Sequence, residues 1–468
     1  MLKNKLAIIS RYRSHKRDII LFLIPQLFLL ALYIAKLIAG ASFNAHFIGN
    51  SNVMQSLNGY MLESDLIGSL KGMHTQPPLL NFVFGLAILA SNTHAHLIIQ
   101  ILWLFVAQIG VFFLTLGIKA ITSNRFLTAS LTVLYIFVPG TVMYSLWSYN
   151  TIWVQSFSII LLSSFIRLLM KKTPLFSFFC LAISSIVLYL IRVPFNFVLT
   201  IFFISISWMI LDKFLRKRIS VVLIASVSIS CICAIQAHYY FNFGLLSTSS
   251  WTLDQSIGVL KKGLLESELS LIAEVSPCFS DVIQKGPWMP IESYDDCRSR
   301  DGIIASNEFF VSSEKANELN SRSRLLGSLA IEKVLFYTAP KYPQAYLRVI
   351  FGGPRFDGTL FSYLGLKNFP FTPVKFLVYN VIPLLFFISF LLLCTLLVLG
   401  KKLYLAELKV LAMPVALTFF MNLYALIGEV VENERIRSDS HAVTFFTGII
   451  LLAYCKKLSL NKKVIHNS

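Results

Sequence analysis

The feature that most constrains this chain is a series of long apolar runs that are nearly free of charged residues. As helices rising 1.5 Å per residue, runs of about 17 to 25 residues cross a hydrocarbon layer of about 30 Å. Hydrophobic residues make up 56% of the 468 positions and charged residues 14%, which leaves too much apolar surface for a water-soluble fold. The clearest runs cover 19–39, 97–118, 152–170, 374–399 and 408–427. We predict an all-α polytopic membrane protein with about ten transmembrane helices.

Lysine and arginine gather beside these runs and not on a single basic surface. Clusters lie at 3–17, 171–172, 213–218, 401–402 and 456–463. The net charge of +18 therefore indicates membrane topology and argues against a nucleic-acid partner. By the positive-inside rule these clusters are cytoplasmic. Since the first run has spanning length and lacks a small-residue cleavage pattern, we expect it to remain as an anchor with the N-terminus inside.

The sequence divides into three parts. Residues 1–240 are expected to form an N-terminal transmembrane module whose first outer loop spans 40–77, and residues 374–468 form the C-terminal transmembrane helices. Between them, residues 241–373 are expected to form an α-rich extracytoplasmic insert. Counting crossings from the basic ends places the insert, the first outer loop and the stretch 429–439 on one non-cytoplasmic face.

One stretch leaves the number of crossings open. Three apolar runs, 78–91, 97–118 and 126–143, lie between two regions that the count places outside. Two outside regions must be joined by an even number of crossings. Either the short first run, about 21 Å long as a helix, fails to span, or the polar turn near Asn150 lies on the cytoplasmic side.

Two cysteines, Cys278 and Cys297, lie in the insert. In an oxidising compartment we predict a disulfide between them, and the alternative is two free thiols. The sequence has no His and Cys cluster at zinc-ligand spacing, so we expect no structural metal.

The first outer loop carries two acids, Glu63 and Asp65, just after the first membrane anchor. A positioned carboxylate can remove the proton from an acceptor hydroxyl and hold its oxygen behind an anomeric carbon, as direct sugar displacement requires. The alternative is a solvated loop with two ordinary acids. Glu63 and Asp65 are therefore candidate catalytic residues.

A predicted helix start follows the two acids. Pro77 and Pro78 suit the first turn of a helix, where a missing N–H costs nothing. A helix N-terminus carries partial positive charge and free N–H groups suited to phosphate. His74 and Gln76 are then expected to line the same face as Asp65 and to bind substrate, although the motif is also compatible with a plain helix start.

These motifs resemble the GT-C superfamily of membrane glycosyltransferases, in particular the protein O-mannosyltransferase and aminoarabinose transferase group. Those enzymes place an acidic pair in the first outer loop, matched by Glu63 and Asp65, and open the next helix with a His-Pro-Pro-Leu or Lys-Pro-Pro-Leu element, matched loosely from His74 to Leu79. The resemblance implies that Asp65 or Glu63 is the catalytic base and that the donor is a sugar on a phosphorylated isoprenoid lipid. The segment 242–251 is also similar to one in uncharacterised bacterial members of the group.

The chain departs from the pattern of that group in two places. Two extra residues separate His74 from Pro77. Asn150 stands at the nearest place comparable to a further acid that the group often carries. The second departure leaves open whether a divalent metal takes part, and we expect no resident cofactor beyond the lipid-linked sugar as co-substrate.

Four further residues are candidate contacts for the lipid phosphate. Arg435 and Arg437 lie on the predicted outer side against the positive-inside trend, and Glu432 can hold an arginine in place. An arginine fork matches the phosphate leaving group as it gains negative charge. Arg192 lies between two apolar runs, where an isolated charge is either functional or snorkels to the interface. The alternative for the first three is an internally neutralised surface loop.

The function that best fits these features is an inverting glycosyltransferase of a bacterial inner membrane, active at the periplasmic or extracellular face. Its expected partners are membrane lipid, a polyprenyl-phosphate sugar, and a glycan, lipid or protein acceptor. An envelope polysaccharide polymerase or ligase is the first alternative, and it would depend on outer-loop arginines more than on Asp65. A transporter or flippase is the second, and it would place charges near the middle of the spans.

Overall fold

The computed structural model describes residues 2–49, 56–73, 77–122, 124–136, 144–191, 200–201, 203–205, 207–208, 218–243, 415, 417, 443 and 446–450. Over these residues the protein is all-α, with one isolated bridge between Asn44 and Trp147. Five of the described helices are long and apolar enough to cross a membrane. The chain is therefore a multi-pass membrane protein.

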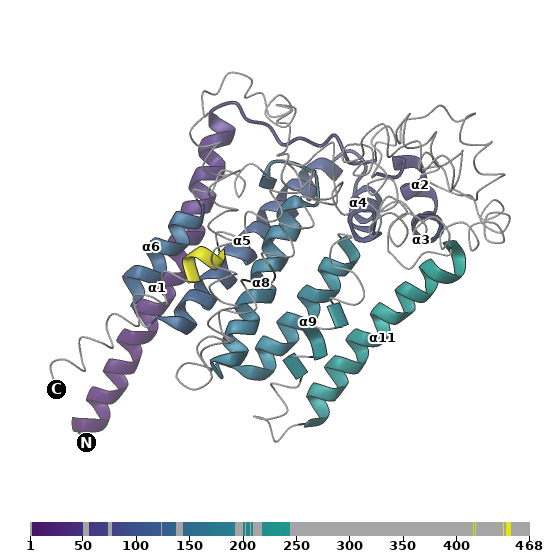
Figure 1. The fold of residues 1–468 in the computed structure, drawn as a ribbon. Helices are drawn as coiled ribbons and strands as arrows, with labels where there is room; N and C mark the ends of the chain where they lie inside the picture. The colour runs from purple at the N-terminus through teal and green to yellow at the C-terminus, as the bar shows by residue number, and fades with distance from the viewer. Residues whose placement is uncertain are drawn as a thin grey trace, which may run out of the picture.

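The long helices coincide with the apolar runs wherever those runs are described (Figure 1). They are α1 Leu2–Ile38, α5 Ala95–Ile121, α8 Thr151–Leu169, α9 Pro174–Ile191 and α11 Arg218–Phe243. The shorter helices are α2 Gly59–Ser64, α3 Leu66–Gly72, α4 Leu79–Ala90 and α6 Arg125–Ile136. The predicted spans 374–399 and 408–427 lie outside the described residues, apart from two single positions in the second.

Helix α5 runs antiparallel to α1. Gln100 Nε2 donates to the Tyr33 hydroxyl at 2.9 Å. Two turns further along α5, Gln108 Nε2 donates to the Gln26 carbonyl at 3.2 Å, so the contacts move back along α1 as they move forward along α5. Helix α5 therefore begins at the end of the bundle where α1 finishes.

Helix α8 runs parallel to α5 and packs closely against it. A Cβ atom added to Gly110 would lie 2.8 Å from Ser156 Oγ, and one added to Gly117 would lie 2.7 Å from Ser163 Oγ. Both pairs have the same sequence offset, which two helices keep only when they run in the same direction. The two glycines allow α8 to approach the α5 backbone, as small residues do between membrane helices.

Two hydrogen bonds extend this order to α9 and α11. Asn150 Nδ2, at the start of α8, donates to the Ile191 carbonyl at 3.1 Å, so α9 ends where α8 begins. The Tyr189 hydroxyl donates to Gln236 Oε1 at 3.0 Å, and therefore α11 also ends at this level. We call this the loop end of the bundle.

The opposite end, which we call the basic end, carries most of the described basic residues outside α1. Arg125 begins α6 there, and Arg218 begins α11. Arg167 Nη2 donates to Thr173 Oγ1 at 2.7 Å across the turn between α8 and α9, which also contains Lys171. Outside α1, most described basic residues that flank spans thus gather where the positive-inside rule predicts a common face.

The position of α4 bears on the open count of crossings. Helix α4 packs beside the first turns of α5, where the Phe84 ring stacks on Trp103 with centroids 5.9 Å apart. Both ends of α4 contact loop-end segments: Leu57 N–H donates to Asn81 Oδ1, and Asn92, just past its last residue, contacts Glu63. Helix α4 therefore stays at the loop end without crossing, which is the first of the two alternatives.

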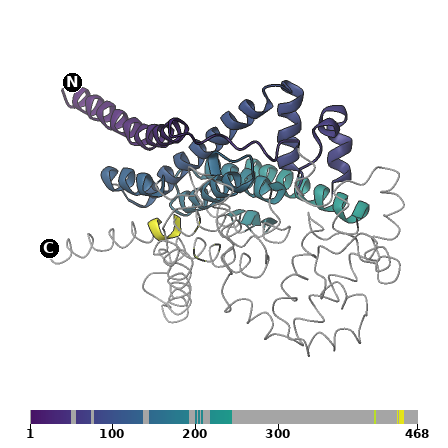
Figure 2. The ribbon, with the colours of Figure 1, turned by 90° about the horizontal axis from the view of Figure 1, so that it is seen from above.

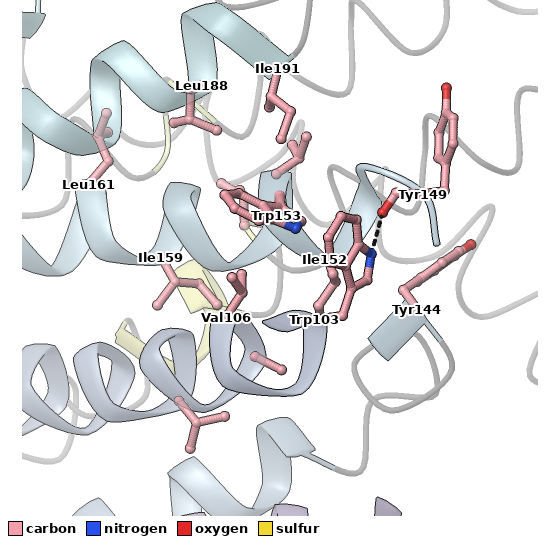
Figure 3. Close-up of a cluster of buried hydrophobic side chains, with 14 of the residues drawn as sticks. Trp103, Val106, Tyr144, Tyr149, Ile152, Trp153, Ile159, Leu161, Leu188 and Ile191 are labelled. Atoms are coloured by element: carbon pink, nitrogen blue, oxygen red, sulfur yellow. Dashed lines mark hydrogen bonds between the residues drawn. The ribbon is translucent and has the colours of Figure 1, made fainter. Parts of the chain in front are cut away.

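Helix α8 forms the centre of the described bundle. In its apolar window 83% of the residues are buried, against 22% in α1 and 22% in α11. The latter two helices lie on opposite sides of the bundle (Figures 1 and 2). Between α5 and α8, Trp103 and Trp153 lie next to each other with ring centroids 5.4 Å apart (Figure 3). The start of α8 is thus both deeply buried and close to the loop end.

Candidate functional site

Asp65 lies at the junction of α2 and α3, where it is the C-cap of α2 and the N-cap of α3. Its backbone N–H donates to the Met61 carbonyl at 3.1 Å and so closes α2. Its carbonyl accepts from the Ser69 N–H at 3.0 Å, which is the first turn of α3. Because the backbone of Asp65 is held from both sides, the position of its side chain is well defined.

The Asp65 carboxylate caps α3 through one oxygen. Oδ1 accepts from the Gly68 N–H at 2.9 Å, the usual bond of an N-cap aspartate. The side chain is exposed, and Oδ2 accepts from none of the described residues. One oxygen therefore anchors the group while the other can receive a proton from a bound hydroxyl.

Gly68 makes room for this carboxylate. A Cβ atom at Gly68 would lie only 1.9 Å from Asp65 Oδ2 and 2.7 Å from its Cγ. Any larger residue at position 68 must push the carboxylate aside. The sequence pattern did not predict this role for Gly68, because an Asp three residues before a Gly is compatible with many helix starts.

Apolar contacts attach α2 and α3 to α4. Leu62 is fully buried and Leu66 is 9% exposed, while the outer faces of both helices are polar or exposed. A Cβ atom on Gly85 of α4 would meet Leu66 Cδ1 at 2.3 Å, so the glycine lets this leucine pack on α4. The Ser69 hydroxyl also donates to the Met61 carbonyl at 3.0 Å and links the two short helices.

Glu63 and Asp65 have different partners, although they are only two residues apart. Glu63 Oε2 accepts from Asn92 Nδ2 at 3.3 Å, which ties α2 to the turn between α4 and α5. Both carboxylates are exposed. The two acids of the predicted pair are thus held separately. Glu63 is bonded by the turn between α4 and α5, and Asp65 is bonded by the first turn of α3.

The predicted helix start after the proline pair is confirmed. Helix α4 begins at Leu79 with Pro78 as its N-cap residue and without a capping side chain. In its first turn Asn81 is fully buried, accepts from the Leu57 N–H at 2.8 Å and donates to Met73 Sδ at 3.4 Å. Asn81 therefore fastens the outer loop on both sides of α2 and α3, a role that the apolar pattern around it did not predict.

Asn150, the residue that departs from the resembled family, lies at the loop end. It is 3% exposed, and its amide bonds the carbonyl of Ile191, which is joined to Arg192 by the next peptide bond. Trp103 Nε1 donates to the neighbouring Tyr149 carbonyl at 2.9 Å. Helix α4, with Phe84 stacked on Trp103, lies between this position and the α2–α3 junction.

Aromatic residues fill the remaining space at the loop end. Phe47 lies 4.7 Å from Tyr149 and 5.6 Å from Trp147 between ring centroids. The backbone of Asn44 pairs with this segment through an N–H bond to the Leu146 carbonyl at 2.8 Å. The first outer loop is thereby packed against the segment that precedes α8.

The other site predictions fall on positions that the structure does not describe. These are the substrate contacts His74, Gln76, Arg192, Glu432, Arg435 and Arg437 and the cysteine pair Cys278 and Cys297. They remain predictions. The described cysteines Cys180, Cys231 and Cys233 are free and lie on α9 and α11.

The described residues contain no group of three or more His, Cys, Asp or Glu side chains that could hold a metal ion. What they offer is two separately held carboxylates, Glu63 and Asp65, and buried polar groups at the start of α8. The chain matches no protein-family model, no curated protein and no solved structure.

Proposed function

We propose that the protein is an inverting membrane glycosyltransferase that moves a sugar from a polyprenyl-phosphate donor to a lipid, glycan or protein acceptor at the non-cytoplasmic face. In this proposal the full chain is GT-C-like, with about ten crossings and an α-rich insert, in a bacterial inner membrane. The observation that carries the proposal is the geometry of Asp65. Its carboxylate is anchored through Oδ1 at the end of the bundle opposite the basic residues, and Oδ2 accepts from no described residue.

The chemistry assigned to Asp65 is general-base catalysis. The acceptor oxygen attacks the anomeric carbon from the side opposite the phosphate, while Asp65 Oδ2 takes the hydroxyl proton. The bond between the anomeric carbon and the phosphate oxygen breaks, and the lipid phosphate leaves with the electron pair. The anomeric configuration inverts because attack and departure occur on opposite faces. Proton removal by a positioned carboxylate contributes roughly 100- to 10,000-fold to such rates.

The anchoring bond makes Asp65→Asn a clean test. Asparagine caps helices about as well as aspartate, so α3 keeps its N-cap while the proton acceptor is lost. Asp65→Ser is a second test variant, because serine is also a good helix cap and lacks the carboxylate. Both variants are expected to fold and insert normally and to lose sugar transfer.

The experiment is complementation of a strain that lacks the gene, with envelope glycans and glycoproteins read by mass spectrometry and protein levels checked in parallel. We expect neither Asp65→Asn nor Asp65→Ser to restore modification. Full restoration by Asp65→Asn and by Glu63→Gln would reject the mechanism and favour the polysaccharide polymerase that depends on arginines.

A further inference from the structure

The first turn of α8 is buried, yet several of its polar groups have no partner. Asn150 is 3% exposed, Thr151 0% and Trp153 8%. Among the described residues, Asn150 Oδ1, Thr151 Oγ1 and Trp153 Nε1 form no hydrogen bond. The helix also lacks a capping side chain. Buried polar groups are nearly always paired in folded proteins, so this cluster calls for an additional partner.

The orientation of the Asn150 amide is set by its one hydrogen bond. Nδ2 donates to the Ile191 carbonyl at 3.1 Å. If the amide were turned over, Oδ1 would face another oxygen acceptor. Oδ1 therefore remains an acceptor, and whatever binds it must donate a proton.

Trp153 lies on the same side of the helix one turn later, because positions three apart share a face. Its indole lies next to Trp103, with ring centroids 5.4 Å apart (Figure 3). On its other side Phe157 lies 5.7 Å away between ring centroids. The adjacent Trp103 uses its own indole N–H on the Tyr149 carbonyl. Trp153 Nε1–H is thus a fixed donor that requires an acceptor.

These two groups together define the chemistry of the missing partner. A phosphate oxygen could accept from Trp153 Nε1–H, but it has no proton to donate to Asn150 Oδ1. A hydroxyl group both donates and accepts, and a sugar ring presents several of them. We infer that the first turn of α8 binds a sugar, with one hydroxyl donating to Asn150 Oδ1 and one sugar oxygen accepting from Trp153 Nε1.

This inference deepens the proposed function and rests on it for the source of the sugar, which is the lipid-linked donor or a glycan acceptor. It does not rest on Asp65, which lies on the other side of α4. The two adjacent tryptophans supply a matched pair of variants. Trp153→Phe removes an unpaired indole N–H, whereas Trp103→Phe removes one that is bonded to Tyr149.

The test is a titration of the full chain in lipid nanodiscs with its six tryptophans labelled at the indole nitrogen. The Trp153 resonance is assigned by its loss in Trp153→Phe. The probes are a short polyprenyl phosphate bearing a hexose, the same lipid phosphate without sugar, and free maltotriose. We expect one or both sugar probes to shift the Trp153 resonance and the bare lipid phosphate to leave it unchanged. A response to the lipid-linked hexose alone assigns the site to the donor, and a response to maltotriose alone assigns it to the acceptor.

Read from the resonance of the neighbouring Trp103, Trp153→Phe is expected to weaken binding of the responding sugar probe by roughly 3- to 10-fold, as for one neutral hydrogen bond. Both Trp153→Phe and Trp103→Phe shrink a buried ring, but only Trp103→Phe also breaks a hydrogen bond, so Trp153→Phe should lower the melting temperature less. Asn150→Leu is a second variant with the same expected loss of binding.

An equal response to the bare lipid phosphate, no response to either sugar probe, or a loss of stability in Trp153→Phe as large as in Trp103→Phe would overturn the inference. If Asp65→Asn keeps full transfer while the Trp153 resonance still responds to sugar, the proposed base fails and this site stands. If Asp65→Asn abolishes transfer while the Trp153 resonance does not respond to sugar, the proposed base stands and only the sugar site at α8 fails.

Discussion

The two ends of the helix bundle are held together in different ways. At the basic end the described hydrogen bonds of the turn between α8 and α9 are local: Arg167 Nη2 bonds Thr173 Oγ1 six residues away, and Lys172 N–H bonds the Arg167 carbonyl. At the loop end the bonds join distant parts of the chain. Phe47 N–H bonds Ser148 Oγ across 101 positions, and His238 Nε2 lies 3.1 Å from the Lys71 carbonyl across 167.

Long-range contacts between described residues are thus a feature of the loop end. A turn between two spans needs only local bonds to reverse direction. A site must hold groups from several segments in one arrangement, and only long-range contacts can do so. The loop end has such contacts around Glu63, Asn81 and Asn150, and therefore we expect substitutions there to affect activity more than comparable changes at the basic end.

Among changes that leave Asp65 itself in place, the largest effect is expected from Gly68→Ala, which displaces the Asp65 carboxylate without altering it. The new Cβ atom would meet Asp65 Oδ2 at 1.9 Å, so the side chain must move. A misplacement of about 1 Å at a reacting group can cost on the order of 100-fold in rate. Sugar transfer by purified protein measures the effect, with the melting temperature as a control for folding. Unchanged activity in a protein of normal stability would show that the position of Asp65 is unimportant.

Gly117→Ala should mainly affect stability. The added methyl would press on Ser163 Oγ at 2.7 Å and on its Cα at 3.3 Å, and backbone cannot move aside cheaply. Overpacking of this kind costs about 1 to 3 kcal/mol in the free energy of unfolding. Gly448→Ala is the matched control, because a Cβ atom there meets nothing within 4 Å. Equal melting temperatures for both variants in detergent would argue against close packing of α5 and α8.

Asn81→Leu should weaken the attachment of the outer loop to α4. It leaves the buried Leu57 N–H without its acceptor, which costs about 1 to 3 kcal/mol. Faster proteolysis of the segment before α2, relative to wild type, is the direct readout. If proteolysis and melting temperature both stay at wild-type values, Asn81 does not fasten the loop.

The smallest effect is expected at the basic end, from Lys171→Gly. Lys171 has φ 55°, a left-handed conformation that costs a side-chain-bearing residue about 1 to 2 kcal/mol and costs glycine little. The lower entropy of the unfolded lysine chain offsets part of this gain. The melting temperature should therefore stay the same or rise slightly, and sugar transfer should be unchanged. A marked loss of transfer would place function at the basic end and break the comparison.

The sequence predicted individual helices better than it predicted their arrangement. Apolar length was enough for α5 and α8, because spanning segments must satisfy their backbone internally. It was not enough for α4, since hydropathy does not report that Phe84 stacks on Trp103 at one end of the bundle. The place of α4 at the loop end became clear only from contacts between helices.

The candidate site was predictable to a similar degree. A carboxylate in the first outer loop directed attention to Asp65, and its capping bond is local enough to follow from nearby residues. The hydrogen bond that holds Glu63 comes from Asn92, which is 29 positions away, so nearby residues do not predict it. The unpaired groups of Asn150 and Trp153 can be recognised only when their surroundings are known, because sequence alone does not show which polar atoms remain without a partner.

The most direct test of the central claim is sugar transfer by purified protein in proteoliposomes, with a radiolabelled polyprenyl-phosphate hexose as donor and membranes of the deletion strain as acceptor. The account predicts that wild-type protein transfers label and that Asp65→Asn, at equal amount and equal melting temperature, is slower by roughly 100- to 10,000-fold. Transfer by Asp65→Asn at the wild-type rate would contradict the assignment of Asp65 as the base.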